Sequence, residues 1–300
     1  MDLLHFLKTF VCLADNGTMS KAMDILQYSQ PTISTHIAAL EDFYKCPLLE
    51  FQNKRYVLTE EGRVLYNYAT KMLTTATEAF DALLEFRNLE RGSLAIGASE
   101  NIGVYMIPQI LTLFRQNYPQ LKLQVVIDKT SEIEKKVINY ELNIGLVEAE
   151  LSSHNKLKIE LLKKEPLILI AAPSHPWAKQ GSIAINDLLK EPFVVGEPGA
   201  GTQKALERQL GDVINHVNVA LDLGSTEAVK KAVANSFGVS IVVESAVTRE
   251  LQAGTLASVS IMGINLYKEY KIIYRNDKHL NAGTQKFLAI LRSIYHEENK

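Results

Sequence analysis

The chain has 300 residues, 47% of them hydrophobic and 22% charged, and a formal net charge of −2. This length predicts two domains, each large enough to bury its own core, and the composition is typical of a soluble globular protein. No apolar run approaches the ~20 residues of a membrane span, and the first ten residues lack the basic start and cleavage site of a secretory signal.

The two cysteines, Cys12 and Cys46, lie within the first fifty residues. So few cysteines favour a reducing compartment without disulfides, and we therefore expect a cytoplasmic protein. The sequence predicts no metal site, because no histidines cluster with these cysteines, and it contains no signal for a cofactor. His154, His175 and His216 are scattered without metal-ligand spacing and are interpreted as surface or packing residues.

Residues 2–14 are predicted to form a first helix with one apolar side. The stretch from Thr18 to Glu41 then predicts two short helices joined by a tight turn. Thr18 and Ser29 are expected to cap them, and Pro31 stands in a first turn, where a missing amide costs nothing. Helical spacing predicts buried residues on one face of each helix: Ala22, Ile25 and Leu26 on the first, and Ile33, Ile37 and Leu40 on the second.

The opposite face of the second helix is small and polar, and it begins at the helix N-terminus. Such a face suits a recognition helix in a DNA major groove, whose N-terminal residues meet base edges. Glutamine pairs with adenine, while serine and threonine contact bases or phosphates. The predicted DNA contacts on this helix are Gln30, Pro31, Thr32, Ser34 and Thr35. The alternative is a helix pair in an ordinary core.

Residues 47–58 are predicted to form two short strands around Asn53 and Lys54, a hairpin beside the helix pair. Lys54 and Arg55 supply positive charge, and Arg55 suits a minor groove; the alternative is a solvated turn cation. Residues 1–62 carry five Lys or Arg against eight Asp or Glu. Nucleic-acid binders usually have a basic footprint, so we expect weak binding per copy and several copies on one DNA site.

A long helix is predicted from Thr59 to about Asn88, with Glu60 and Glu61 in its first turn, where they suit the helix dipole. Apolar residues recur along it in alternating steps of four and three, which is a heptad seam: Leu65, Ala69, Met72, Ala76, Ala79, Leu83 and Phe86. We favour pairing with the same helix of a second chain. The alternative is a helix that lies on its own domain.

From Ser20 to Gly62 the sequence resembles the winged helix-turn-helix of LysR-type transcriptional regulators. The matching stretches are Ser20-Lys21-Ala22, Ser29 to Ser34, Leu40-Glu41, Pro47-Leu48, Arg55 and Leu58 to Gly62. The resemblance implies an N-terminal all-α winged helix-turn-helix at 1–58 and a linker or dimerisation helix at 59–90.

After Arg91 and Gly92, predicted strands and helices alternate, which favours mostly parallel sheets covered on both faces. The strand candidates are 93–97, 121–127, 143–147, 166–172, 193–195, 217–223, 239–243 and 270–275. The family resemblance implies a C-terminal α/β, two-lobed, periplasmic-binding-protein-like (type 2) effector-binding domain at 91–300. Lobe I would comprise 91–164 and 268–300, and lobe II 165–267.

Ligands of such sheets lie beyond the carboxyl ends of strands, near helix N-termini. Several predicted strands here end in hydroxyl-bearing helix starts, so amides, helix dipoles and hydroxyls would together bind an anion. The candidate effector-binding residues are Ser99, Asn101, Ile102, Val147, Glu148, Gly201, Thr202, Ser225 and Thr226. The alternative for the glycine-containing segment 196–202 is a plain strand-to-helix turn.

We expect no enzymatic activity. The segment 196–202 lacks the lysine of a phosphate-binding P-loop. Ser99, His175 and Asp222 lack the G-x-S-x-G elbow that would support a catalytic triad.

The sequence therefore predicts a transcription regulator that binds double-stranded DNA and a small effector, expected to be an anion. The long helix would form a homodimer or contribute to a homotetramer, and an activator would also contact RNA polymerase. Segments 99–109 and 196–204 resemble a subgroup that senses metabolites linked to sulfur assimilation or carbon fixation. The alternatives are a solute-binding module without DNA function and an α/β enzyme with a helical appendage.

Overall fold

A computed structural model describes residues 2–86, 93–148, 151, 155–196, 201–276 and 280–295. The chain forms two compact units. The first comprises residues 1–92 with 138–141, and the second comprises 93–137 with 142–300. Within the described residues no helix is both long and apolar enough to cross a bilayer.

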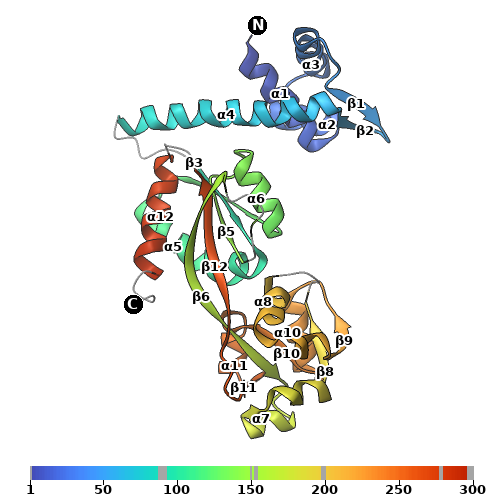
Figure 1. Cartoon of the computed structure of the whole chain (residues 1–300). Coiled ribbons are helices and arrows are strands. Elements are labelled where there is room, and N and C mark those ends of the chain that lie inside the picture. Colours follow the sequence, from blue (N-terminus) through green and yellow to red (C-terminus); the bar gives the residue numbers. More distant parts are fainter. Residues whose placement is uncertain are drawn as a thin grey trace. The chain divides into compact units, whose positions relative to one another are not determined.

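The first unit is a small helical head with a two-stranded hairpin (Figure 1). Its elements are α1 (Leu3–Asn16), α2 (Met19–Leu26), α3 (Gln30–Tyr44), β1 (Leu49–Gln52), β2 (Arg55–Leu58) and α4 (Glu60–Phe86). Strands β1 and β2 pair antiparallel from Leu49–Leu58 to Gln52–Arg55. Asn53 and Lys54 between them both have positive φ, as a tight hairpin turn requires. The predicted helices and hairpin are confirmed.

The core of the head forms where α1 packs against α2, α3 and α4. Its fully buried members include Leu7, Phe10, Ile33 and Leu40. Ser29 caps α3 as predicted, because its hydroxyl accepts from the amide of Thr32 at 3.4 Å.

Two details of the predicted α2 are wrong. Thr18 stands at its N-cap, but its side chain makes no capping hydrogen bond. Ile25 is 59% exposed, because the packed face of α2 is centred on Met19, Ala22 and Leu26. At about 100° per residue, Ile25 points well away from that centre.

Helix α4 is continuous over 27 residues, about 40 Å at the usual rise. Its predicted seam does not face a partner along its whole length, because Leu65 and Ala69 are buried in the core of the head. Met72, Ala76 and Ala79 are exposed. The side chains of Leu83 and Phe86, and residues 87–92, lie outside the described residues.

The second unit is built on a mixed sheet with strand order β4-β3-β5-β12-β6-β11-β7, with β10 also on β6. The strands are β3 (Ser93–Ala98), β4 (Lys122–Ile127), β5 (Ile144–Val147), β6 (Leu157–Ala171), β7 (Ser182–Ile183), β8 (Pro192–Val195), β9 (Asn218–Asp222), β10 (Ser240–Val243), β11 (Ala257–Ile261) and β12 (Leu266–Arg275). The helices are η1 (Ile102–Met106), α5 (Ile107–Asn117), α6 (Thr130–Ile138), α7 (Pro176–Gln180), η2 (Ile185–Lys190), α8 (Gly201–Leu210), α9 (Asp212–Asn215), α10 (Thr226–Ala234), η3 (Glu244–Ala246), α11 (Thr248–Gln252) and α12 (Ala282–Tyr295).

The expectation of mostly parallel sheets is wrong at the centre of this unit. The long strands β6 and β12 run antiparallel to each other, and β5, β10 and β11 each pair antiparallel with one of them. Antiparallel neighbours need no crossover helix, so βα alternation in the sequence does not reveal them. The sequence also missed β7, β11 and the first half of β6.

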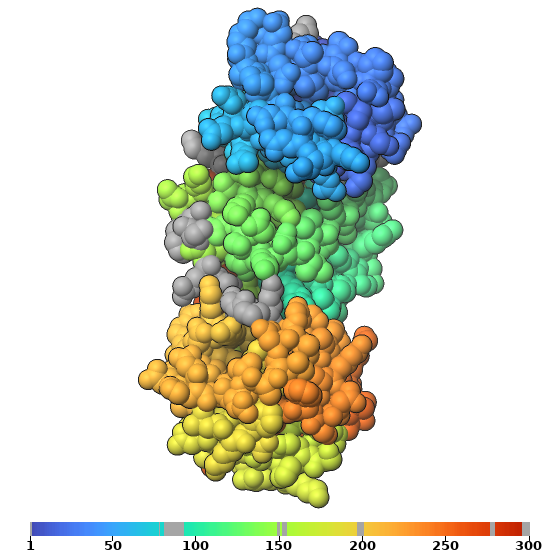
Figure 2. All heavy atoms as spheres, turned by 90° about the vertical axis from the view of Figure 1, so that its right-hand side faces the viewer, coloured from blue at the N-terminus to red at the C-terminus, as the bar shows by residue number. Residues whose placement is uncertain are grey.

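Two groups of elements pack around the two ends of this strand pair (Figure 1). Lobe I has a core from β3, β5, α5 and α12, in which the rings of Phe114 and Phe287 meet edge to face at 5.4 Å. Lobe II has cores from β8, β10, α8 and α10. In the space-filling view the green atoms of lobe I and the yellow and orange atoms of lobe II form two masses (Figure 2).

Candidate functional site

The first candidate site is the surface at the start of α3. Gln30, Pro31, Ser34 and Thr35 are exposed and Thr32 is half-buried. Thr35 donates its hydroxyl to the carbonyl of Pro31 at 2.8 Å. The core contacts of α3 lie on its other face, so this polar face is open to solvent within the head.

The hairpin provides the second part of this surface. Lys54 lies in the turn and Arg55 opens β2, and both side chains are exposed. Tyr56 donates its backbone amide to the carbonyl of Gly17 at 2.8 Å, which fixes the hairpin to the α1–α2 turn. The head therefore holds an exposed helix N-terminus and an exposed cationic turn on one rigid support.

The second candidate site is a cluster at the loops predicted to bind an effector. The carboxylate of Glu148, just after β5, accepts from the amide of Ile102 at 3.3 Å and from the Asn101 side chain at 3.4 Å. Lys268 of β12 forms an ion pair with the same carboxylate. Lys268 also donates to the hydroxyl of Thr202, at the start of α8, at 2.8 Å.

The start of α10 joins lobe II to the same segment of lobe I. Thr226 donates its hydroxyl to the side-chain amide oxygen of Asn101, Oδ1, at 3.0 Å. Tyr105 of η1 donates to Glu227 at 2.7 Å. Burial and this hydrogen bond raise the pKa of Tyr105, so the phenol stays protonated and remains a donor. The start of α10 in lobe II is thus held to Asn101 and η1 of lobe I by direct side-chain contacts.

The remaining predicted effector-binding residues have other structural roles. The side chains of Ile102 and Val147 are fully buried in the core, and Ser225 uses its hydroxyl to cap α10 by accepting from the amide of Ala228. The Ser99 hydroxyl is buried and has no hydrogen-bond partner among the described residues. Gly201 approaches the backbone of Glu148 closely, since an added Cβ would lie 3.1 Å from its carbonyl oxygen. Positions 197–200 lie outside the described residues.

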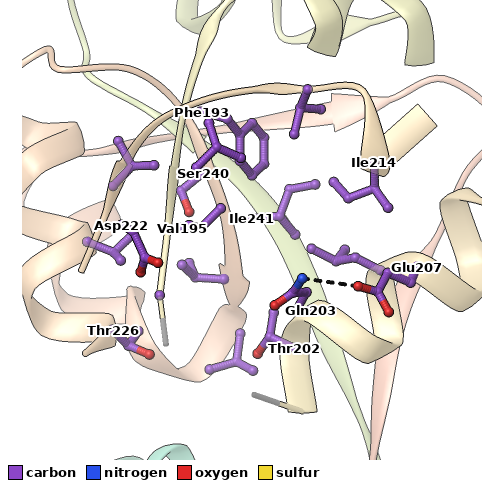
Figure 3. Close-up of a pocket in the computed structure, with 18 of the residues that line it drawn as sticks. Phe193, Val195, Thr202, Gln203, Glu207, Ile214, Asp222, Thr226, Ser240 and Ile241 are labelled. Carbon is purple, nitrogen blue, oxygen red and sulfur yellow. Dashed lines mark hydrogen bonds between the residues drawn. The ribbon is translucent and has the colours of Figure 1, made fainter. Parts of the chain in front are cut away.

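Beside this cluster a cavity of about 320 Å³ extends into lobe II (Figure 3). Asn101, Thr202 and Thr226 line its polar end. The rest of its wall is mainly apolar: Phe193, Val194, Val195, Leu206, Ile214, Val217, Val219, Ile241, Val242 and Val243. Its volume is near the lower end of the ~300–1,000 Å³ range of small-molecule sites.

Sequence reasoning missed Lys268 and this apolar wall. Leu266, Lys268 and Tyr270 occupy alternate positions of β12, and all three are buried. Because side chains at i and i+2 share one face of a strand, a lysine flanked in this way signals a buried, partnered charge. The wall could not be found from the sequence, because it is assembled from several separate elements.

Comparison with known proteins agrees with this architecture. The family model described as "Bacterial regulatory helix-turn-helix protein, lysR family" matches residues 4–63, and the one described as "LysR substrate binding domain" matches residues 87–294. A probable RuBisCO transcriptional regulator from Thalassiosira pseudonana is 34% identical over 285 residues, which cover 92% of each chain.

Two solved structures extend the comparison. A full-length OxyR variant from Pseudomonas aeruginosa matches with a TM-score of 0.75 at 22% identity and covers 97% of this chain and 95% of its own. The CcmR regulatory domain from Synechocystis PCC6803, in complex with 2-PG, matches with a TM-score of 0.61 at 27% identity and covers 68% of this chain and 97% of its own.

A helix-turn-helix head followed by a two-lobed effector-binding domain defines a DNA-binding transcriptional regulator rather than an enzyme. The chain belongs to the LysR family of transcriptional regulators. Members of this family bind DNA and small-molecule effectors, and this chain has the domains for both.

Proposed function

We propose that this regulator contacts its operator through Gln30, Pro31, Thr32, Ser34 and Thr35 of α3 and through Lys54 and Arg55 of the hairpin. The proposal is carried by the exposure of Gln30, Pro31, Ser34 and Thr35 at the start of α3 and of Lys54 and Arg55 on the neighbouring hairpin. Side chains at the start of α3 would meet base edges, and the hairpin cations would meet phosphates or a minor groove. It would act in the cytoplasm, where its DNA partner lies.

The head would bind DNA as part of a homodimer formed through residues 59–88. Val64 and Tyr68 of α4 are 59% and 60% exposed, and Met72 is 40% exposed. Steps of four place them along one face of the helix. With Tyr44, Cys46 and Leu48 they border a hollow of about 410 Å³ in the head. Apolar surface of this kind marks protein interfaces, and the helix of a second copy fits it. A pair of such dimers would give a homotetramer.

The effector would bind between the lobes at the cluster around Asn101, Thr202 and Thr226. The hydroxyls and amides at the starts of η1, α8 and α10 favour a group with negative charge, and Ser99 and Gly201 border this position. The structure of the CcmR regulatory domain with 2-PG supports a ligand in the corresponding domain.

We propose three domains: the head at 1–58, the linker at 59–90 and the effector-binding domain at 91–300. Within the effector-binding domain, lobe I comprises 91–164 and 268–300, and lobe II comprises 165–267.

Effector binding would then act on transcription through the lobes. A ligand that binds one lobe arrangement better than another shifts their populations by its differential affinity. If the regulator is an activator, this shift would alter its contact with RNA polymerase.

Mobility shift with the DNA beside its own gene tests the proposal. Thr35→Ala and Arg55→Ala should each weaken retardation while leaving thermal stability unchanged, and Lys8→Ala on the exposed side of α1 is the matched control. Absence of retardation by a folded dimer at low salt would count against the function. Equal affinity of all four proteins would count against the assigned surface.

A further inference from the structure

The position where an effector anion is expected already holds a carboxylate of the chain itself. An anion at the start of η1 would meet the amide of Ile102 and the ammonium of Lys268, and both bind Glu148. The side chains of Glu148 and Lys268 are only 6% and 1% exposed. The lysine charge is therefore neutralised inside the protein and is not available to a ligand unless Glu148 leaves.

The charged side chains around the cavity also disfavour a multiply charged anion. Glu100, Glu207 and Asp222 line it, and the described lining residues include no lysine or arginine. Figure 3 places Asp222 and Glu207 on opposite sides of the cavity. Repulsion grows with each negative charge that a ligand carries and is stronger where water is partly excluded. A multiply charged anion thus meets the carboxylates of Glu207 and Asp222, and no lysine or arginine stands among the described lining residues.

The wall itself selects for apolar groups. Among the lining residues, Val195, Ile214 and Val217 are half-buried and Val219 is exposed, so the wall presents accessible apolar surface. A compact, fully polar anion would leave this wall in contact with water, whereas an aliphatic or aromatic group would bury it, at roughly 25 cal/mol for each Å² removed from water.

We propose that Glu148 determines the charge specificity of the effector site. Its carboxylate fills the anion position, so the effector is a molecule with an apolar body and at most one negative charge. The body occupies the cavity in lobe II, and the polar group meets Asn101, Thr202 and Thr226. This inference rests on the proposed effector site and names the ligand class that it selects.

Removal of the Glu148 carboxylate tests whether this side chain fills the anion position, and the test does not require the effector to be known. In full-length Glu148→Ala, acetate or inorganic phosphate should restore part of the lost thermal stability, because either anion can take the vacated place beside Lys268 and Ile102. We expect apparent affinity for phosphate at least tenfold tighter than in the unaltered protein, measured against chloride at equal ionic strength. If phosphate stabilises both proteins equally, or stabilises neither, Glu148 does not fill the anion position.

Two further variants separate this effect from general stabilisation by salt. Glu165→Ala removes another buried carboxylate, 2% exposed, that pairs with Lys163 and is not among the cavity-lining residues, and should leave the affinity for phenyl phosphate unchanged. Glu148→Gln combined with Lys268→Met keeps the pair neutral and should fold without responding to phosphate. Should Glu148→Ala fail to fold, Glu148→Ser also vacates the carboxylate position and gives the same comparison. An equal phosphate response in the double variant, or an equal rise in phenyl phosphate affinity in Glu165→Ala and Glu148→Gln, contradicts the assignment.

Three probes with one ring in common test the ligand class by calorimetry on the unaltered protein: benzamide, benzoate and phenyl phosphate. The first two should bind at least tenfold tighter than phenyl phosphate, and in Glu148→Gln the phenyl phosphate affinity should rise. Tightest binding of phenyl phosphate to the unaltered protein, or binding of none of the three, overturns the proposed class. If the protein does not retard DNA but shows this selectivity, the proposed DNA contacts fail and the effector inference stands.

Discussion

Arg292 of α12 binds Glu160 of β6 through three contacts: its Nη2 atom lies 2.8 and 2.9 Å from the two carboxylate oxygens, and its Nε lies 3.2 Å from one of them. Tyr274 of β12 donates to the same carboxylate. The Glu160 carboxylate thus joins α12, the C-terminal helix of lobe I, to both long strands, β6 and β12, that the lobes share.

This contact predicts a pH dependence of stability. Burial alone would raise the pKa of Glu160, but the hydrogen bonds from Tyr274 and Arg292 outweigh it and lower the pKa below 4.5. A carboxyl with a lowered folded-state pKa stabilises fully above its unfolded value and loses that contribution as the pH falls through the folded value. We expect Arg292→Met to cost about 1 kcal/mol at pH 7, since the pair is partly solvated.

Urea unfolding at pH 7 and below pH 4 measures this effect. The difference between Arg292→Met and the unaltered protein should shrink at the lower pH. Lys135→Met, which removes an exposed ion pair on α6, is the control and should change little at either pH. A cost of Arg292→Met that is the same at both pH values would show that packing, not the ion pair, accounts for it.

Gly62 is required by its distance from Leu48. A Cβ at Gly62 would lie 2.0 Å from the Leu48 carbonyl oxygen, so the first turn of α4 can pack on the chain before β1 only with glycine there. Gly62→Ala should destabilise the head by about 1–3 kcal/mol, seen as a lower thermal midpoint. Gly224→Ala, where an added Cβ would meet no atom within 4 Å, is the matched control. An unchanged midpoint for Gly62→Ala would contradict this packing.

Because the proposed dimer interface is the exposed apolar face of α4, we expect a charged residue on this face to dissociate the dimer. Tyr68→Glu should shift sedimentation from dimer to monomer, because it places a charge in the proposed interface. Asn67→Glu introduces the same charge at the neighbouring exposed position, about 100° around the helix, and should leave the dimer intact. Dissociation by both variants would indicate a general charge effect, and dissociation by neither would move the interface elsewhere.

The salt dependence of DNA binding distinguishes the roles of the two proposed contacts. Arg55→Ala should lower the slope of log K against log salt concentration by about 1, as expected for a lost phosphate contact. Thr35→Ala should weaken binding by about 1–3 kcal/mol on the specific sequence and leave the slope unchanged, as expected for a base contact. Titrations between about 50 and 200 mM salt on specific and scrambled DNA measure both quantities. A reversed pattern would exchange the two roles.

The head was predictable in detail because its structure is set by interactions between near neighbours in the chain. Ser29 and Pro31 define the start of α3, and Asn53 and Lys54 allow the tight turn between β1 and β2. The 3.6-residue period then separates Ile33 and Leu40 from the open polar face. Ile25 was misplaced because the width of a buried face depends on which neighbours pack against it.

The sequence also located the strand ends and helix starts around the cleft, because glycines and hydroxyl residues mark such turns. Asn101, Glu148, Thr202 and Thr226 lie far apart in the chain, yet the structure joins them in one hydrogen-bonded cluster.

What the sequence alone determined, then, is where each helix and turn begins and which short motifs they carry, because those depend on residues a few positions apart. Only the tertiary structure decided that Lys268 reaches Glu148, and that β8, β9, β10 and α8 enclose an apolar cavity. The physical reason is that such contacts depend on the register of β12 against β5 and β6 and on the packing of whole elements, which no local pattern encodes.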